Sequence, residues 1–176
     1  LGVVDESIKK GLLKYKGVER RFQYHGNFLT NSGKEFKLID DYGHHPTEIK
    51  VTLEACKEAF PNQKILLVFQ PHRYSRTRDL FEEFIKVLSE VNALILLPVY
   101  AAGEVEIVGT DSKTLARSIR ILKKVNPFVV SNEIEALDMI FSILDSGDIL
   151  LLMGAGSVSK LTNLIKNEVE RGGYEQ

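Results

Sequence analysis

The sequence is poor in cysteine and has no long apolar stretch, and these absences exclude several classes of protein. Its single cysteine, Cys56, cannot form an internal disulfide, and its place in a helical apolar stripe is typical of core packing. A lone thiol of this kind fits a reducing compartment, so we expect a cytoplasmic location. No apolar run approaches the ~18 residues that span a bilayer, and the first residues carry no signal-peptide pattern. The sequence therefore predicts neither a disulfide-rich secreted module nor a membrane partner.

The sequence also lacks an excess of charge of either sign. Its 23 basic and 24 acidic residues give a net charge of −1, and no five consecutive residues are Lys or Arg. Nucleic-acid-binding proteins usually present a basic patch, so we expect no nucleic-acid partner. With 44% apolar and 27% charged residues, the 176-residue chain suits one globular core. No G-x-x-x-x-G-K-[S/T] loop is present, so any nucleotide chemistry needs a phosphate cradle from elsewhere.

Hydrophobic periodicity predicts a short first helix, a hairpin and then repeating strand–helix units. Asp5 can cap the first helix, and Gly17 can end it. Alternating residues from Arg20 to Asp40, interrupted by a turn at 31–34, predict two or three antiparallel strands. Continuous apolar runs predict buried parallel strands at residues 65–69, 93–97, 128–130 and 149–153.

Each apolar run leads through a polar loop into an amphipathic helix. Pro46 suits the first turn of the helix after the hairpin. One helix that includes Arg78 and Leu88 is predicted after the first parallel strand, and later helices start at Asp111 and Asn132. The sequence therefore predicts an α/β fold, with a mostly parallel sheet flanked by helices and an antiparallel hairpin at its start.

The most polar loops follow the carboxyl ends of the predicted strands. Right-handed crossovers place all these ends on one edge of the sheet, which is where open α/β sheets bind ligands. The first loop, D-D-Y-G-H-H-P-T-E at 40–48, packs two carboxylates, a phenol and two imidazoles into one turn. The others are residues 70–78, 100–104 and 154–157. We expect these loops to share one rim.

The loop at 70–78, Q-P-H-R-Y-S-R-T-R, has three arginines and a histidine directly before a helix. Guanidinium forks match carboxylates and phosphates, so this cluster is typical of an anion-binding site; exposed charges on a solvated loop are the alternative. Arg73 and Arg76 are the better candidates for binding the anion. By its spacing Arg78 falls within the helix, where it can pair with Glu82 at i+4.

The three imidazoles of His44, His45 and His72 allow a zinc centre as an alternative. Adjacent histidines without a third at fixed spacing are weak evidence, so we expect hydrogen bonding and carboxylate contacts, and no metal site. Asp40 and Asp41 occupy adjacent strand positions and should point to opposite faces, one toward the cleft and one orienting the loop.

Two glycine-containing loops are ambiguous. Residues 154–157, G-A-G-S, form half of a dinucleotide fingerprint and by themselves predict only a tight turn. In residues 100–104, Glu104 can line the rim, or Gly103 can simply make the turn.

The motifs at 40–48 and 69–78 closely resemble the carboxyl-terminal part of the Mur ligases. K-G-V-E-R-R-F, V-Y-A-A-G-E, G-T-D-S and G-A-G-S-V resemble the same family in the same order. The resemblance implies a Rossmann-like carboxyl-terminal domain at 18–176, preceded at 1–17 by the tail helix of a central ATPase domain. Leu1 in place of Met agrees with a fragment of a longer chain.

The resemblance implies an ATP-dependent bacterial ligase in peptidoglycan precursor synthesis. In the family, the carboxylate of UDP-N-acetylmuramate becomes an acyl phosphate, and the amine of L-alanine attacks it to give an amide. Magnesium and the main catalytic groups are expected in the central domain, so the chain alone should be inactive. By motif position, Arg21 and Asp41 resemble the pair that holds the ATP ribose. The residues that resemble the L-alanine wall are Tyr42, His44, His72, Arg73 and Arg76.

Two alternatives remain open at this stage. The related ligase that attaches a whole tripeptide resembles the chain in the Asp-Asp loop but differs in the arginine loop, where Arg76 favours the alanine-adding members. The second alternative is a free-standing α/β module that binds a nucleotide or another anion. A phosphate loop and a UDP-binding domain upstream in the same reading frame would favour the ligase over this module. The resemblance does not separate Arg20 from Arg21 as the ATP contact.

Overall fold

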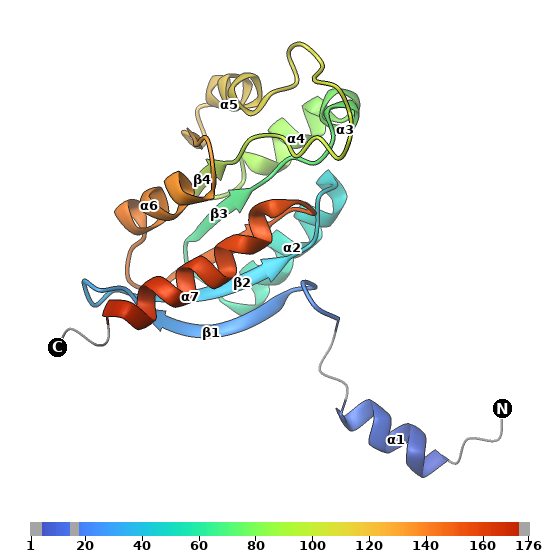
Figure 1. Cartoon of the computed structure of the whole chain (residues 1–176), viewed down its shortest axis with the longest axis vertical. Coiled ribbons are helices and arrows are strands. Elements are labelled where there is room, and N and C mark those ends of the chain that lie inside the picture. Colours follow the sequence, from blue (N-terminus) through green and yellow to red (C-terminus); the bar gives the residue numbers. More distant parts are fainter. Residues whose placement is uncertain (1–4, 15–17, 173–176) are drawn as a thin grey trace.

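The structure, a computed structural model, describes residues 5–14 and 18–172 (Figure 1). Within these ranges six strands form one sheet in the order β1-β2-β6-β3-β4-β5. The β1–β2 pair is antiparallel and all other neighbours are parallel, which confirms the predicted fold class. The strands are β1 (Gln23–Leu29), β2 (Glu35–Asp41), β3 (Ile65–Phe69), β4 (Ala93–Leu96), β5 (Phe128–Val129) and β6 (Asp148–Met153).

Helices cover both faces of this sheet (Figure 1). The covering helices are α2 (Pro46–Ala59), α3 (Tyr74–Asp79), α4 (Phe81–Leu88), α5 (Ser112–Ile121), α6 (Glu133–Ile143) and α7 (Lys160–Gly172), with a 3₁₀ turn η1 (Ser157–Ser159). Helix α1 (Asp5–Lys14) lies apart from the sheet (Figure 1). Strand side chains alternate between two layers. In β6, Ile149 and Leu151 pack with α2, α4 and α5, whereas Leu150 and Leu152 pack with α6 and α7. This burial on both faces explains why the parallel strands read as continuous apolar runs.

The predicted helix starts agree with the observed caps. Asp111 caps α5 by accepting a hydrogen bond from the Thr114 amide, and Asn132 caps α6. Asp5 is instead the first helical residue of α1 and lies in its first turn. The predicted helix end at Gly17, and with it the boundary expected between residues 17 and 18, lies outside the described residues.

The helix expected after β3 is divided into α3 and α4 at Leu80, whose φ of −117° and ψ of 27° are not helical. The expected pairing of Arg78 with Glu82 is therefore wrong, because it requires one unbroken helix. Arg78 Nε instead lies 2.8 Å from Oδ1 of Asp79. The break separates the short α3, which follows the arginine loop, from α4, which packs in the core.

The position of β6 between β2 and β3 brings distant loops together. Asp41 is paired with Met153, and the Gly154 amide donates to the carbonyl of Asp41 at 3.2 Å. The Gln70 amide likewise donates to the carbonyl of Met153 at 3.0 Å. The loops after β2, β3 and β6 thus meet at one edge of the sheet.

None of the described helices is long and apolar enough to cross a membrane.

Candidate ligand site at the carboxyl edge of the sheet

The two carboxylates that end β2 have separate partners. Asp41 accepts hydrogen bonds from the amides of Phe22 and Gly43, each at 2.7 Å, and so fixes the loop on both sides of the strand end. Asp40 binds the Nε atom of Arg20 at 3.0 Å. We expected one aspartate to face the cleft and the other to orient the loop. In the structure Asp41 does both, because it lines a cavity and binds the loop amides, whereas Asp40 is paired with Arg20.

A capping box explains part of the polar density in this loop. Glu48 Oε2 accepts from the amides of His44 and His45 at 2.8 and 3.0 Å, and the Thr47 amide donates to His45 Nδ1 at 3.3 Å. Burial acts against ionisation of Glu48, but these amide donors hold its pKa below its ordinary value. His45 is therefore a helix cap, whose Nδ1 accepts from the Thr47 amide in the first turn of α2.

The arginine loop is held by the loop that follows β4. The Arg73 amide donates to the carbonyl of Tyr100, and the Tyr100 amide donates to the carbonyl of Pro71, both at 2.8 Å. Arg73 has φ of 73°, a left-handed conformation that is strained for a residue with a side chain. Arg76 Nη1 lies 3.1 Å from the His72 carbonyl oxygen and 3.3 Å from His72 Nδ1. Both arginines thus have defined positions at the rim.

Four aromatic rings form a row along this edge. The ring centroids of Tyr42 and His44, of His44 and His72, and of His72 and Tyr100 are each 5.4 Å apart. The last pair is stacked, with 15° between the planes. Desolvation, with His44, Arg76 and Arg73 nearby, lowers the pKa of His72 and so favours its neutral ring.

The structure therefore brings together most residues of the alanine wall that the motifs suggest. Tyr42, His44, His72 and Arg76 are in contact along the row, and Arg73 lies at the exposed start of α3. Tyr100 was not expected in this row. The only sequence signal for it was its place in a polar loop at a strand end.

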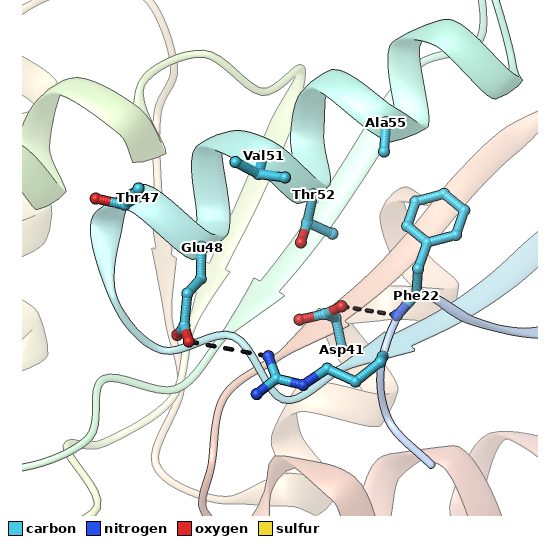
Figure 2. Close-up of a pocket in the computed structure, with 8 residues that line it drawn as sticks. Phe22, Asp41, Thr47, Glu48, Val51, Thr52 and Ala55 are labelled. Carbon is cyan, nitrogen blue, oxygen red and sulfur yellow. Dashed lines mark hydrogen bonds and ion pairs between the residues drawn. The ribbon is translucent and has the colours of Figure 1, made fainter. Parts of the chain in front are cut away.

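A cavity of about 420 Å³ lies beside Asp41, between the chain before β1 and helix α2 (Figure 2). Arg21 lines it, with Nη1 3.8 Å from Glu48 Oε1. Arg20 is directed elsewhere, because its Nη2 donates to the Gly154 carbonyl at 2.5 Å and its Nε to Asp40. Arg21 is thus the arginine that faces this cavity. Its lining residues are Arg21, Phe22, Asp41, Thr47, Glu48, Val51, Thr52 and Ala55.

The amino end of α3 already carries a carboxylate from the chain itself. Glu104 accepts from the Ser75 amide at 2.9 Å and from the Ser75 hydroxyl at 2.5 Å. Helix starts of this kind commonly bind ligand anions, and the sequence pattern suggested such a role here. The Ser75 amide, however, is occupied by Glu104. An incoming anion in this region would meet the side chains of Arg73 and Arg76.

Gln70, at the start of the arginine loop, joins that loop to the last loop of the rim. Its Nε2 donates to the Ser157 hydroxyl at 3.0 Å, and its Oε1 accepts from the Val158 amide at 2.9 Å. Residues 154–157, G-A-G-S, thus make a turn that packs on Gln70, which is the tight turn that their sequence predicted.

Within residues 5–14 and 18–172, no three His, Cys, Asp or Glu side chains are grouped so that they could hold a metal ion.

Fold and site together define an α/β domain whose sheet edge presents a basic, aromatic-walled rim beside the cavity at Asp41. Residues 20–156 match the model of the family described as "Mur ligase, glutamate ligase domain", and the chain belongs to this family.

The chain is similar to UDP-N-acetylmuramate–L-alanine ligases. It is 50% identical over 161 residues to that of a Neisseria meningitidis serogroup A strain and 51% identical over 160 residues to that of Nitrosomonas europaea. These alignments cover 92% and 91% of the chain but 34% of each relative. The chain thus spans about a third of the length of the curated relatives it matches.

Solved structures show the same fold. The UDP-N-acetylmuramate-alanine ligase of Thermotoga maritima is 28% identical, with a TM-score of 0.68 over 95% of this chain and 33% of that one. A domain of a putative Haemophilus ducreyi ligase has a TM-score of 0.60 at 18% identity, over 86% of this chain and 99% of that one. The similarity to the Haemophilus ducreyi domain concerns the fold alone, and it shows this fold in a solved chain of nearly the same length.

Proposed function

We propose that the chain is the carboxyl-terminal domain of an ATP-dependent ligase that joins L-alanine to UDP-N-acetylmuramate in bacterial peptidoglycan synthesis. The observation that carries the proposal is the contact of Arg76 with the ring of His72, which lies 5.4 Å from the ring of His44 at the edge of the sheet that also carries Arg73. Relatives that are about half identical in sequence bear the name of this ligase. The cytoplasm, where such precursors would be made, is the proposed location.

In the proposed reaction, this domain presents the amino acid to a carboxylate that ATP has activated. The nitrogen lone pair of alanine attacks the acyl-phosphate carbon, the new C–N bond forms, and the C–O bond to phosphate breaks; the amine loses a proton. Arg76 and Arg73 would bind the α-carboxylate of alanine through charge-assisted hydrogen bonds. The row from Tyr42 to Tyr100 would shield these bonds from water and so strengthen them.

The cavity beside Asp41 is the proposed place of the ATP ribose. Each Asp41 oxygen accepts one amide, and a carboxylate oxygen has room for a second donor, so both can also accept from ribose hydroxyls. Arg21 would close the polar side, and Phe22 and Val51 offer an apolar wall. Magnesium, which would neutralise the ATP phosphates, is proposed to bind in the central domain together with those phosphates.

Residues 1–17 are proposed to be the tail of the preceding central domain, and 18–176 the domain proper. Helix α1 lies apart from the sheet in Figure 1, and its apolar side chains Ile8 and Leu13 are 47% and 86% exposed. An amphipathic helix of this kind needs an apolar partner to be stable in water. The central domain would supply that partner.

The test is product formation by the full-length protein that contains this domain. Purified enzyme is incubated with ATP, magnesium and UDP-N-acetylmuramate, and with either L-alanine or the tripeptide of the recycling ligases. The expected result is a product whose mass has gained one alanine, and far less tripeptide adduct. The 176-residue chain alone should release no phosphate from ATP. Preferred tripeptide transfer, or anion binding without any adduct, would contradict the proposal in favour of one of the alternatives.

A further inference from the structure

Glu104 makes a contact between two separate segments of the chain, and it has no part in the alanine site proposed above. It belongs to the loop after β4, yet both its carboxylate oxygens bind Ser75 of α3. Ser75 lies in the chain between Arg73 and Arg76. Glu104 therefore contacts the segment that carries both arginines without touching either guanidinium through a hydrogen bond.

The turn before Glu104 is built to direct it toward α3. The Glu104 amide donates to the carbonyl of Ala101 at 3.0 Å, and the two residues between them, Ala102 and Gly103, have φ of 51° and 85°. Such left-handed pairs reverse the chain tightly. Tyr100, at the other end of this turn, exchanges backbone hydrogen bonds with the arginine loop. The turn is thus fixed at both ends before the carboxylate of Glu104 reaches Ser75.

Helix α3 needs such an external contact. It has six residues, too few for a helix to be stable by itself, and its N-cap residue Arg73 makes no side-chain capping bond. Arg73 is also in a left-handed conformation, which persists only where the surroundings enforce it. Glu104 supplies the missing cap from another loop, by accepting the amide and hydroxyl of Ser75. Those hydrogen bonds from Ser75 lower the pKa of Glu104, which is thus ionised at neutral pH.

We propose that Glu104 is a positioning residue for amino-acid binding: by capping α3 at Ser75 it holds Arg73 and Arg76 in the geometry that grips the substrate carboxylate. By occupying the helix amide itself, Glu104 also directs that carboxylate to the guanidinium groups. This inference rests on the proposed function of the rim.

The test compares Glu104→Gln and Ser75→Ala in the full-length ligase, with Glu106→Gln as the matched control. Glu106 is an exposed glutamate of the same loop. Loss of a charge-assisted cap should raise the KM for alanine about tenfold in Glu104→Gln, while the KM for ATP changes by less than about twofold. Ser75→Ala should have a smaller effect of the same kind, and the double variant should be no worse than Glu104→Gln alone.

A second readout requires no catalysis. In the isolated chain, the Ser75 amide should exchange its hydrogen faster in Glu104→Gln than in the wild type or in Glu106→Gln, while core amides keep their protection. An active wild type whose KM for alanine is unaffected by Glu104→Gln would overturn this inference alone. Equal rises in the KM values for alanine and ATP would also overturn it, as they indicate general damage. A wild type without alanine ligation would overturn the proposed function and this inference together.

Discussion

Arg20 and Asp40 form a nearly buried ion pair, in which the guanidinium also donates to the backbone carbonyl of Gly154. The exposed fractions of the two side chains are 19% and 4%, whereas the next residue, Arg21, is 54% exposed. These adjacent arginines thus have different roles. Arg20 joins the chain before β1 to the ends of β2 and β6, and Arg21 lines a cavity.

Replacing Arg20 should therefore destabilise the fold, and replacing Arg21 should not. Arg20→Ala leaves the Asp40 carboxylate buried without its partner, which typically costs about 3 kcal/mol of unfolding free energy. Arg21→Ala removes an exposed contact at 3.8 Å and should cost less than about 0.5 kcal/mol. Urea unfolding of the two variants, followed by circular dichroism, measures the difference. Equal losses would mean that the pairing of Arg20 does not stabilise the fold.

Arg76 should act on one substrate only. In the full-length ligase, Arg76→Ala should weaken alanine binding by about 2–4 kcal/mol, because charge-assisted bonds in a closed cleft are lost. Arg76→Lys keeps the charge without the fork and should recover only part of this loss. Steady-state kinetics with alanine and ATP varied separately is the measurement. A change in the KM for ATP, with that for alanine constant, would make Arg76 a phosphate ligand instead.

Cys56 should make stability depend on pH in the alkaline range. Burial, aided by the charge of Asp41, raises the pKa of its thiol from 9.0 to about 12. Between these values the unfolded chain loses the thiol proton and the folded chain keeps it, so the free energy of unfolding falls as the pH rises above 9. Cys56→Ala should show a smaller fall over the same range. Urea unfolding from pH 7 upward, compared between wild type and variant, tests this slope, and identical slopes would contradict it.

Gly156 should tolerate no side chain, for steric reasons alone. A Cβ atom there would lie 2.5 Å from Gln70 Oε1 and 2.7 Å from Tyr100 Cγ, although the φ of −98° suits any residue. Gly156→Ala should therefore cost about 1–3 kcal/mol and disturb the hydrogen bonds of Gln70 with Ser157 and Val158. Thermal unfolding tests this, with Ala155→Gly as a control in the same loop. A variant as stable as the wild type would show that Gln70 and Tyr100 can move aside.

Local pattern was sufficient to predict the elements and insufficient to predict their interactions. Each predicted parallel strand lies within one residue of the observed one, because burial on both faces leaves an uninterrupted apolar run. The break at Leu80 was missed, since apolar spacing continues across it. The order of the strands was not deducible from periodicity, because it depends on pairing between segments far apart in the chain.

The same limit applies to the rim. Right-handed crossovers were enough to place the polar loops on one edge, and the motif residues do gather there. The partner of each side chain was not predictable, since contacts such as those of Arg20 with Gly154 and Gln70 with Val158 join residues 134 and 88 positions apart. Glu104 was ambiguous for this reason. Its proposed role depends on Ser75, which lies 29 positions earlier, in α3.

The central place of β6 has a consequence for how the domain is made. Strand β2 pairs with β1 and β6, and β3 pairs with β4 and β6, so the two halves of the sheet are joined only through this last strand. A ribosome delivers residues 148–153 after the five other strands. Until then β2 and β3 each expose an unpaired edge, which is prone to aggregation. Completion of the sheet must therefore wait until residues 148–153 have left the ribosome, and a nascent chain stopped before residue 148 would be a substrate for chaperones and proteases rather than a smaller folded domain.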